Sequence, residues 1–402
     1  MRTLILSDLH LGSLSGSDLL RRPELRAPLL ERVSQVDRVV LLGDVLELRH
    51  GPPREAMAAA RPFFEDLGRA LGEGELVVTS GNHDHALVEP WLAGRGLDVQ
   101  PTPLSLEQLI EPADASPALE LMADWAAPAR TRVAYPGLWV RPDIYAMHGH
   151  YLDAHLTVPT LERLSIAAMS RVLGRPASSF SSVSDYESVS APVFAWRDAV
   201  ARDTRTGAAL NGYATVTAWS ALRERGGADR AGASNQRRRR LDRVSLVKSV
   251  RRRAIVTGFP VAVALLNRAG LGPLKAEIST SELRRAGLSA MGDVAARLGL
   301  DEAHVVFGHT HRAGPLPGDD QREWRGRSGA HLVNSGSWTY APVFLTDTPG
   351  ESPYWPGSCV LVEDTGPPVL EHLLGDRGHA ELAPTPRRAK AQAQANAGAP
   401  TL

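Results

Sequence analysis

The stretch Thr3–His10, with the sequence TLILSDLH, decides how the rest of the chain is interpreted. Its β-branched and apolar residues are followed at once by Asp8 and His10, which is typical of a buried strand that ends in a polar loop. The same order, an apolar run and then Asp, Asn or His, recurs along the chain. The runs predicted as strands are Thr3–Leu6, Arg38–Leu42, Glu75–Val78, Ile144–Met147 and His304–Phe307.

Five short polar motifs follow these strands and carry residue types that bind metal ions. They are Asp8-Leu9-His10, Gly43-Asp44, Gly81-Asn82-His83-Asp84, His148-Gly149-His150 and Gly308-His309-Thr310-His311. Each motif alone is weak evidence, because lone Asp and His residues at strand ends are more often turn or surface residues. Since strand ends can meet at one edge of a sheet, the five motifs together predict a two-metal site there.

The donor types suggest a role for each side chain. The two carboxylate oxygens of Asp44 can bridge two cations about 3.5 to 4 Å apart. A mixture of nitrogen and oxygen ligands, including the Asn82 carbonyl, favours Mn, Fe, Zn or Co over Ca or Mg. His83 is the candidate proton donor to a leaving group, and we expect Asp84 to hold the His83 imidazole in one tautomer.

Composition describes an ordinary globular chain. The 402 residues include 45 Lys plus Arg and 45 Asp plus Glu, so no overall charge bias favours nucleic acid or an anionic surface. The single cysteine excludes an internal disulfide framework and fits a reducing compartment. Because Met1 and Arg2 lead directly into a strand, we expect no secretory leader. We expect the protein to lie in the cytoplasm, and residues 237–267 leave a peripheral association with a membrane open.

The chain divides by character. Residues 1–151 alternate apolar runs with longer stretches such as Pro53–Leu71, which we predict as a helix. Residues 152–300 are rich in Ala, Arg, Ser and Leu and are predicted to be a mainly helical insertion or cap. Short runs at 331–333, 359–363 and 369–373 predict a second group of mostly antiparallel strands, and 376–402 are expected to be a disordered tail.

The order of the five motifs, with Asn334-Ser335-Gly336-Ser337-Trp338 after the last, resembles the calcineurin-like metallophosphoesterase family. The resemblance covers residues 1–151 and 301–375. It implies an α/β fold, a four-layer α-β-β-α sandwich of two mixed sheets. It also implies two divalent metal ions, with Mn favoured, that supply hydroxide for hydrolysis of a phosphomonoester, phosphodiester or pyrophosphate bond. The implied ligands are Asp8, His10, Asp44 and His311 for one ion and Asp44, Asn82, His148 and His309 for the other.

The substrate stays open at this stage. Residues 237–253 hold eight Arg and one Lys against one Asp, and 254–267 are uncharged. Three interpretations of these two segments stay open. They could form an exposed basic loop beside a buried helix, or contact an anionic membrane surface or a lipid-linked substrate. The third interpretation is a contact with nucleic acid. Gly43-Asp44-Val45-Leu46-Glu47 also resembles a stretch of bacterial UDP-2,3-diacylglucosamine pyrophosphohydrolases. A nuclease and a non-catalytic scaffold are the other candidates, and the sequence leaves the oligomeric state open.

Overall fold

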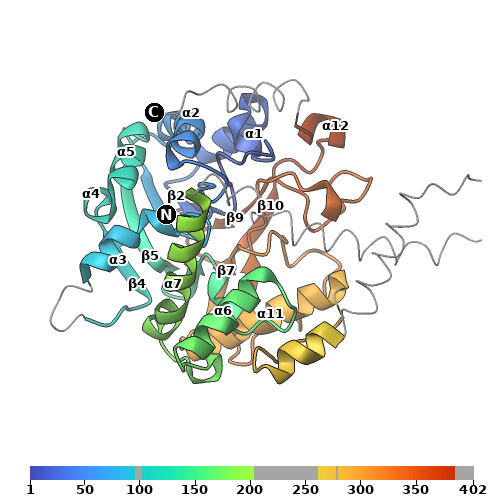
Figure 1. The fold of residues 1–402 in the computed structure, drawn as a ribbon. Helices are drawn as coiled ribbons and strands as arrows, with labels where there is room; N and C mark the ends of the chain where they lie inside the picture. The colour runs from blue at the N-terminus through green and yellow to red at the C-terminus, as the bar shows by residue number, and fades with distance from the viewer. Residues whose placement is uncertain (96–101, 203–260, 278, 385–402) are drawn as a thin grey trace, which may run out of the picture.

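The computed structural model describes residues 1–95, 102–202, 261–277 and 279–384 (Figure 1). The basic segment 237–253, the first part of the apolar segment, 254–260, and the last 18 positions of the expected tail, 385–402, lie outside the described residues. The rest of the apolar segment, 261–267, is helical and mostly exposed.

The strands form one mixed sheet in the order β10-β9-β1-β2-β3-β5-β6-β7-β8, with β4 paired to β5. Their bounds are β1 (Thr3–Leu6), β2 (Arg38–Leu42), β3 (Glu75–Thr79), β4 (Glu107–Ile110), β5 (Arg130–Arg141), β6 (Ile144–Met147), β7 (His304–Phe307), β8 (His331–Asn334), β9 (Ser358–Val362) and β10 (Val369–His372). The five strands predicted from apolar runs are confirmed. Each is short and almost wholly buried, as expected for strands covered on both faces.

The helices lie on both sides of the strands (Figure 1). Their bounds are α1 (Pro23–Val33), α2 (Pro53–Leu71), α3 (Glu89–Arg95), α4 (Pro112–Ala115), α5 (Pro117–Trp125), α6 (Leu161–Val172), α7 (Val183–Arg202), α11 (Thr280–Arg297) and α12 (His379–Leu382). The predicted helix Pro53–Leu71 is confirmed as α2. It starts with proline at its first position and buries Ala56, Ala60, Phe63 and Leu67 at helical spacing. Among the described residues, no helix is long and apolar enough to cross a membrane.

The twelve-residue strand β5 joins the two halves of the sheet. Its first part pairs in parallel with β3, and its last part pairs antiparallel with β6. Strand β5 therefore links two sets of paired strands into one ten-stranded mixed sheet. The three C-terminal strands do not form one antiparallel group: β8 extends β7 in parallel, whereas at the opposite end β9 pairs antiparallel with β1 and β10 pairs antiparallel with β9.

Three hydrophobic clusters show how helices and strands pack. One joins α1, α2 and α5 to residues of β1, β2 and β3. A second joins α7 and α11 to β6 and β7, and the third consists mainly of strand residues from both halves of the sheet. The chain is therefore a mixed α/β protein. The four-layer arrangement and the division into a core and an insertion remain predictions, although the described secondary structure of 152–300 consists of helices.

The first part of the expected tail, 376–384, belongs to the folded structure. Residue 376 was the expected start, but α12 follows it, and Leu382 is fully buried in the cluster that holds α1 and α2. Arg22 donates hydrogen bonds to the carbonyl oxygens of Leu382 and Ala383 at 2.9 and 3.1 Å. Because the sequence after 376 is of low complexity, the contribution of Leu382 to the core could not be recognised from composition.

We therefore expect Leu382→Ala to lower the free energy of unfolding by about 2 to 5 kcal/mol, because it leaves a cavity in the core. Leu121→Ala, at a side chain that is 42% exposed on α5, is the matched control and should change it by less than about 1 kcal/mol. Urea unfolding of both variants measures the difference. Equal losses would mean that α12 is not part of the folding unit.

Candidate metal centre

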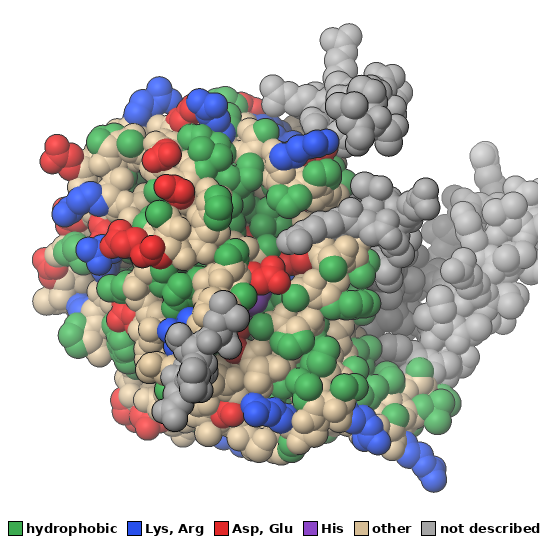
Figure 2. All heavy atoms as spheres, turned by 60° about the vertical axis from the view of Figure 1, so that its left-hand side comes forward, with side chains coloured by type: hydrophobic (Ala, Val, Ile, Leu, Met, Phe, Trp, Pro, Cys, Tyr) green, Lys and Arg blue, Asp and Glu red, His purple; other side chains and the backbone are tan. Residues whose placement is uncertain are grey.

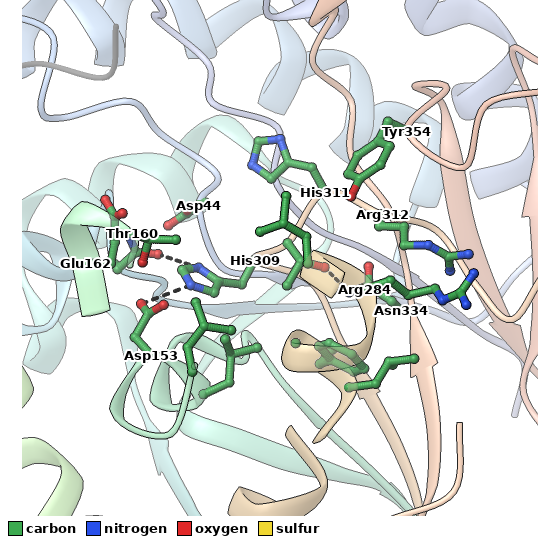
Figure 3. A pocket seen from close by; sticks show the side chains of 18 of the residues that line it. Asp44, Asp153, Thr160, Glu162, Arg284, His309, His311, Arg312, Asn334 and Tyr354 are labelled. Atoms are coloured by element: carbon green, nitrogen blue, oxygen red, sulfur yellow. Dashed lines mark hydrogen bonds and ion pairs between the residues drawn. The ribbon is translucent and has the colours of Figure 1, made fainter. Parts of the chain in front are cut away.

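All seven predicted metal ligands lie together at the carboxyl ends of strands. Asp8 and His10 follow β1, Asp44 follows β2 and Asn82 follows β3, and these three strands are parallel neighbours. His148 follows β6, while His309 and His311 follow β7, again a parallel pair. In Figure 2 histidine shows in a depression beside acidic side chains. Figure 3 shows a cavity whose lining includes Asp44, His309 and His311.

One group of donors consists of Asp8, His10 and His311. The Oδ1 atom of Asp8 lies 3.2 Å from His311 Nε2 and 3.9 Å from His10 Nε2, and the two imidazole nitrogens are 3.2 Å apart. The other oxygen of Asp8 accepts hydrogen bonds from the Ser7 hydroxyl at 2.5 Å and the His309 main-chain N–H at 2.9 Å. Those two donors fix the carboxylate so that Oδ1 faces the imidazoles.

A second group consists of Asn82, His148 and His309. The carbonyl oxygen of Asn82 lies 3.2 Å from His148 Nε2 and 3.0 Å from His309 Nδ1. The remaining nitrogens have their own partners: His148 Nδ1 lies 3.0 Å from the Leu42 carbonyl oxygen, and His309 Nε2 lies 3.0 Å from Asp153 Oδ2. Such partners orient an imidazole and raise its basicity as a ligand. Asp153 was not predicted, because it belongs to no motif.

Asp44 lies between the two groups. Its Oδ2 atom is 3.6 Å from His10 Nε2 and 3.4 Å from His148 Nε2, and its Oδ1 accepts the His83 main-chain N–H at 2.8 Å. The side chain is almost fully buried. One carboxylate oxygen is therefore shared by imidazoles that belong to different groups.

The spacing of the donor atoms fits a metal ion. Ligands about 2.1 Å from one ion, at angles of 90 to 110°, lie about 3.0 to 3.4 Å from each other. The triads Asp8, His10 and His311 and Asp44, His148 and His309 each offer donor atoms within 4.8 Å of one another. The buried Asp8 Oδ1 accepts no hydrogen bond, so it has a coordination position to fill. These residues can therefore hold a metal ion.

The backbone is strained where the ligands lie. Six described residues other than glycine have positive φ, and five of them are ligand candidates. They are Asp8 at 56°, His10 at 45°, Asp44 at 50°, His309 at 65° and His311 at 58°. This conformation is uncommon in residues other than glycine and is concentrated at functional sites, where the surrounding structure enforces it.

Two glycines allow the strand ends to approach each other. Gly43 has a φ of 78°, and a Cβ atom there would lie 2.6 Å from the His148 ring. A Cβ atom on Gly308 would overlap the side chains of Ser7 and Asp8. Asn334, in the stretch after the last histidine motif, donates to the Gly308 carbonyl oxygen and the Thr310 hydroxyl, both at 2.9 Å. These contacts hold the loop that carries His309 and His311.

The candidate catalytic residue His83 is held by a different carboxylate from the one predicted. Its Nδ1 atom lies 3.0 and 2.9 Å from the two oxygens of Glu47, and Glu47 Oε2 also lies 3.1 Å from His10 Nδ1. His83, His10 and Asp44 form a further triad of donor atoms that could hold an ion. Glu47 thus supports two imidazoles at once. Its spacing three residues after Asp44 was the sequence signal for it.

Asp84 instead holds the main chain of the site. Its carboxylate accepts N–H groups from Val45 and Gly81, both at 2.7 Å, and from Leu46 at 3.2 Å. The expectation that Asp84 orients the His83 imidazole therefore does not match the structure, in which Asp84 ties the loop after β2 to the loop after β3. Sequence proximity to His83 was misleading, because the side chain points toward the backbone of another strand end.

The carboxylates and imidazoles shift each other's protonation. Burial opposes the charged form of Asp8 and Asp44, yet nearby histidines hold the pKa of Asp8 at about 2 and that of Asp44 well below its usual value. Burial would likewise lower the pKa of His10 and His148, but Glu47 and Asp44 raise the pKa of His10 to about 9, and Asp44 raises that of His148 to about 10. Both imidazoles are cations at neutral pH in the metal-free protein.

We expect metal binding to release protons, because an ion can bind only the deprotonated nitrogens of His10 and His148. Near pH 7, below the pKa values of about 9 and 10, up to about two protons leave, and affinity rises about tenfold per pH unit for each. Calorimetric titration with Mn²⁺ in buffers of different ionisation enthalpy measures the number. His148→Asn should release one proton fewer, and heats independent of the buffer would contradict this protonation state.

We expect Glu47→Gln to weaken metal binding about 10- to 100-fold while the fold is retained, because a carboxylate that fixes a ligand imidazole contributes this much to affinity. Metal content after dialysis and the equilibrium affinity for Mn²⁺ measure the effect. Glu302→Gln, at an exposed carboxylate with an ion pair to Arg325, is the control and should bind as the parent protein does. Unchanged affinity in Glu47→Gln would show that His10 needs no such support.

Comparison with known proteins leaves the family open. No family model and no curated protein matches the chain. Among solved structures, a cold-active protein-tyrosine phosphatase of a psychrophile Shewanella species aligns with 93% of this chain and 78% of its own, at 13% identity. The TM-score of this alignment is 0.27.

Proposed function

We propose that this chain is a metal-dependent phosphoesterase that hydrolyses a phosphomonoester, phosphodiester or pyrophosphate bond with two divalent transition metal ions, Mn favoured. The observation that carries the proposal is the position of Asp44 Oδ2, 3.6 Å from His10 Nε2 in one donor group and 3.4 Å from His148 Nε2 in the other. A carboxylate shared by two groups of nitrogen and oxygen donors is the arrangement that a pair of neighbouring ions requires.

The proposed ligands divide between the two groups. Asp8, His10, Asp44 and His311 would hold one ion, and Asp44, Asn82, His148 and His309 the other. When bound, such a pair supplies a water nucleophile at neutral pH and positive charge for the phosphate oxygens. The protein side chains fix where the phosphate group sits, because the strained loops and the buried Asp8 and Asp44 leave the donors little freedom to move.

His83 is the proposed proton carrier. Burial, together with the charge of Arg49, lowers the pKa of His83 to about 4 despite the attraction of Glu47 and Asp44. At neutral pH the imidazole is therefore neutral, and it donates its Nδ1 proton to the ionised Glu47, whose pKa lies well below its usual range. To act as the proton donor expected from the sequence, Nε2 must first take up a proton. An anionic substrate bound beside it would favour that uptake.

The other candidate functions receive less support. The nuclease was inferred from the basic segment 237–253, which lies outside the described residues. The contact with a membrane surface was inferred from 237–267, of which the structure describes only 261–267. A lipid-linked pyrophosphate remains one of the substrates that the proposed chemistry accommodates. A non-catalytic scaffold would not need groups of side chains that could hold a metal ion, and the described residues contain three such groups.

We expect the purified protein with added Mn²⁺ to hydrolyse bis(4-nitrophenyl) phosphate or 4-nitrophenyl phosphate, and a chelator to abolish the turnover. Asp44→Ala should lose turnover and metal, because it removes the shared ligand. His83→Asn should keep metal and lose about 10²- to 10⁴-fold in kcat, the usual contribution of a proton-transferring side chain. Release of nitrophenolate and metal content are the two measurements.

His331→Asn is the matched control, since His331 lies on β8 beside His304 and away from the donor groups. It should behave as the parent protein. Loss of bound metal in His83→Asn would place His83 among the ligands and overturn its role as a proton carrier. Metal-loaded protein without turnover on either ester would contradict the proposed activity on simple phosphoesters.

A further inference from the structure

A cavity of about 320 Å³ extends from the candidate metal centre toward α11. At one end it is lined by site residues that include Asp44, His83 and His309. Beyond them the walls are mostly apolar and come from the segment after β6, from α11, from β7 and from the loop that follows it. The main apolar residues are Leu152, Leu156, Leu283, Leu288, Phe307 and Trp324.

The arginines at the far end of the cavity do not make it a second anion site. Figure 3 shows Arg284 and Arg312 on the side away from Asp44 and Asp153. Arg312 Nη2 lies 2.6 Å from Asp319 Oδ1, and Arg284 Nη2 lies 2.8 Å from Glu323 Oε2. The Arg312 guanidinium also lies over the Trp324 ring, 5.2 Å from its centroid. Each positive charge is matched by a carboxylate, so the end of the cavity is close to neutral.

A buried glycine on α11 leaves part of this space open. Gly287 lines the cavity within a helix, where glycine is less favourable than alanine by about 1 kcal/mol. A Cβ atom built at this position would have only one neighbour within 4 Å, Thr310 Cγ2 at 3.7 Å. Neither the helix nor a close packing contact therefore requires glycine here. A larger side chain at 287 would project into the cavity.

We propose that this cavity binds an apolar substituent of the phosphoester, an alkyl chain or an aromatic ring, while the phosphate group lies at the metal donors. The inference rests on the proposed function and adds the class of substrate. It follows from an apolar pocket that is continuous with a polar centre, the usual form of a site that orients a small ligand. An apolar group leaving water for these walls gains affinity with each methylene.

The test measures the affinity of Mn²⁺-loaded protein for methyl-, butyl-, hexyl- and phenylphosphonate by calorimetry. These probes share one head group and are not hydrolysed. We expect Kd to fall about fourfold per methylene up to the length that fills the cavity. A gain for hexyl over phenyl would assign alkyl chains, and the reverse would assign aromatic rings; either supports the proposal.

Variants at position 287 locate the binding. Gly287→Leu should remove most of the gain for hexylphosphonate over methylphosphonate, whereas Gly287→Ala should keep most of that gain, because its single added carbon meets no close contact. If Gly287→Leu fails to fold, Leu283→Gln changes the polarity of the same wall at a partly exposed position. A hexyl gain that survives in the folded variant overturns the assignment to this cavity.

The two proposals fail in different ways. If methylphosphonate binds only when Mn²⁺ is present but longer chains bind no more tightly, the cavity proposal is wrong and the phosphate site stands. If methylphosphonate binds no better with Mn²⁺ than with a chelator, the proposed phosphoesterase itself is contradicted.

Discussion

The need to neutralise three neighbouring buried carboxylates dominates the structure of the site. Asp8, Asp44 and Glu47 are each at most 3% exposed, and burial of an uncompensated carboxylate costs several kcal/mol. In the structure histidines supply the compensation, since His10 and His148 have pKa values of about 9 and 10. The imidazolium protons therefore lie where positive charge is needed. A bound metal ion would replace these protons and would compensate the carboxylates with a larger positive charge.

The fold brings this charge together by aligning strand ends. Three parallel strands deliver Asp8, Asp44 and Asn82, and a second parallel pair delivers His148 and His309. The long strand β5 links the two sets of strands. The chain must turn sharply directly after each strand for the side chains to meet. The positive φ values at five donors are the local cost of that convergence, which the packed strands beneath them sustain.

The sequence allowed the cluster of candidate ligands to be predicted, because each candidate lies within four residues of the end of a strand that an apolar run makes recognisable. The supporting residues were harder to find. Glu47 and Asp84 are both carboxylates near His83 in sequence, and only the three-dimensional course of the loops shows that Glu47 contacts the imidazole whereas Asp84 accepts main-chain N–H groups. Asp153 contacts His309 from the short helix His150–Ala154 and lies three residues after the end of the His148-Gly149-His150 motif.

Long-range pairing was equally invisible. The apolar runs of β8, β9 and β10 are alike in length and composition, yet β8 joins one end of the sheet and the other two join the opposite end. The local residue pattern predicts that a strand forms, but it does not predict with which other strand it pairs. The same limit applies to the cavity: Leu283 and Gly287 look like ordinary helix residues in the sequence. Only the packing of α11 against the loop after β7 gives them a place beside a charged centre. Polar donors concentrated at the strand ends and neutral walls along α11 therefore divide one cavity into two chemically different parts.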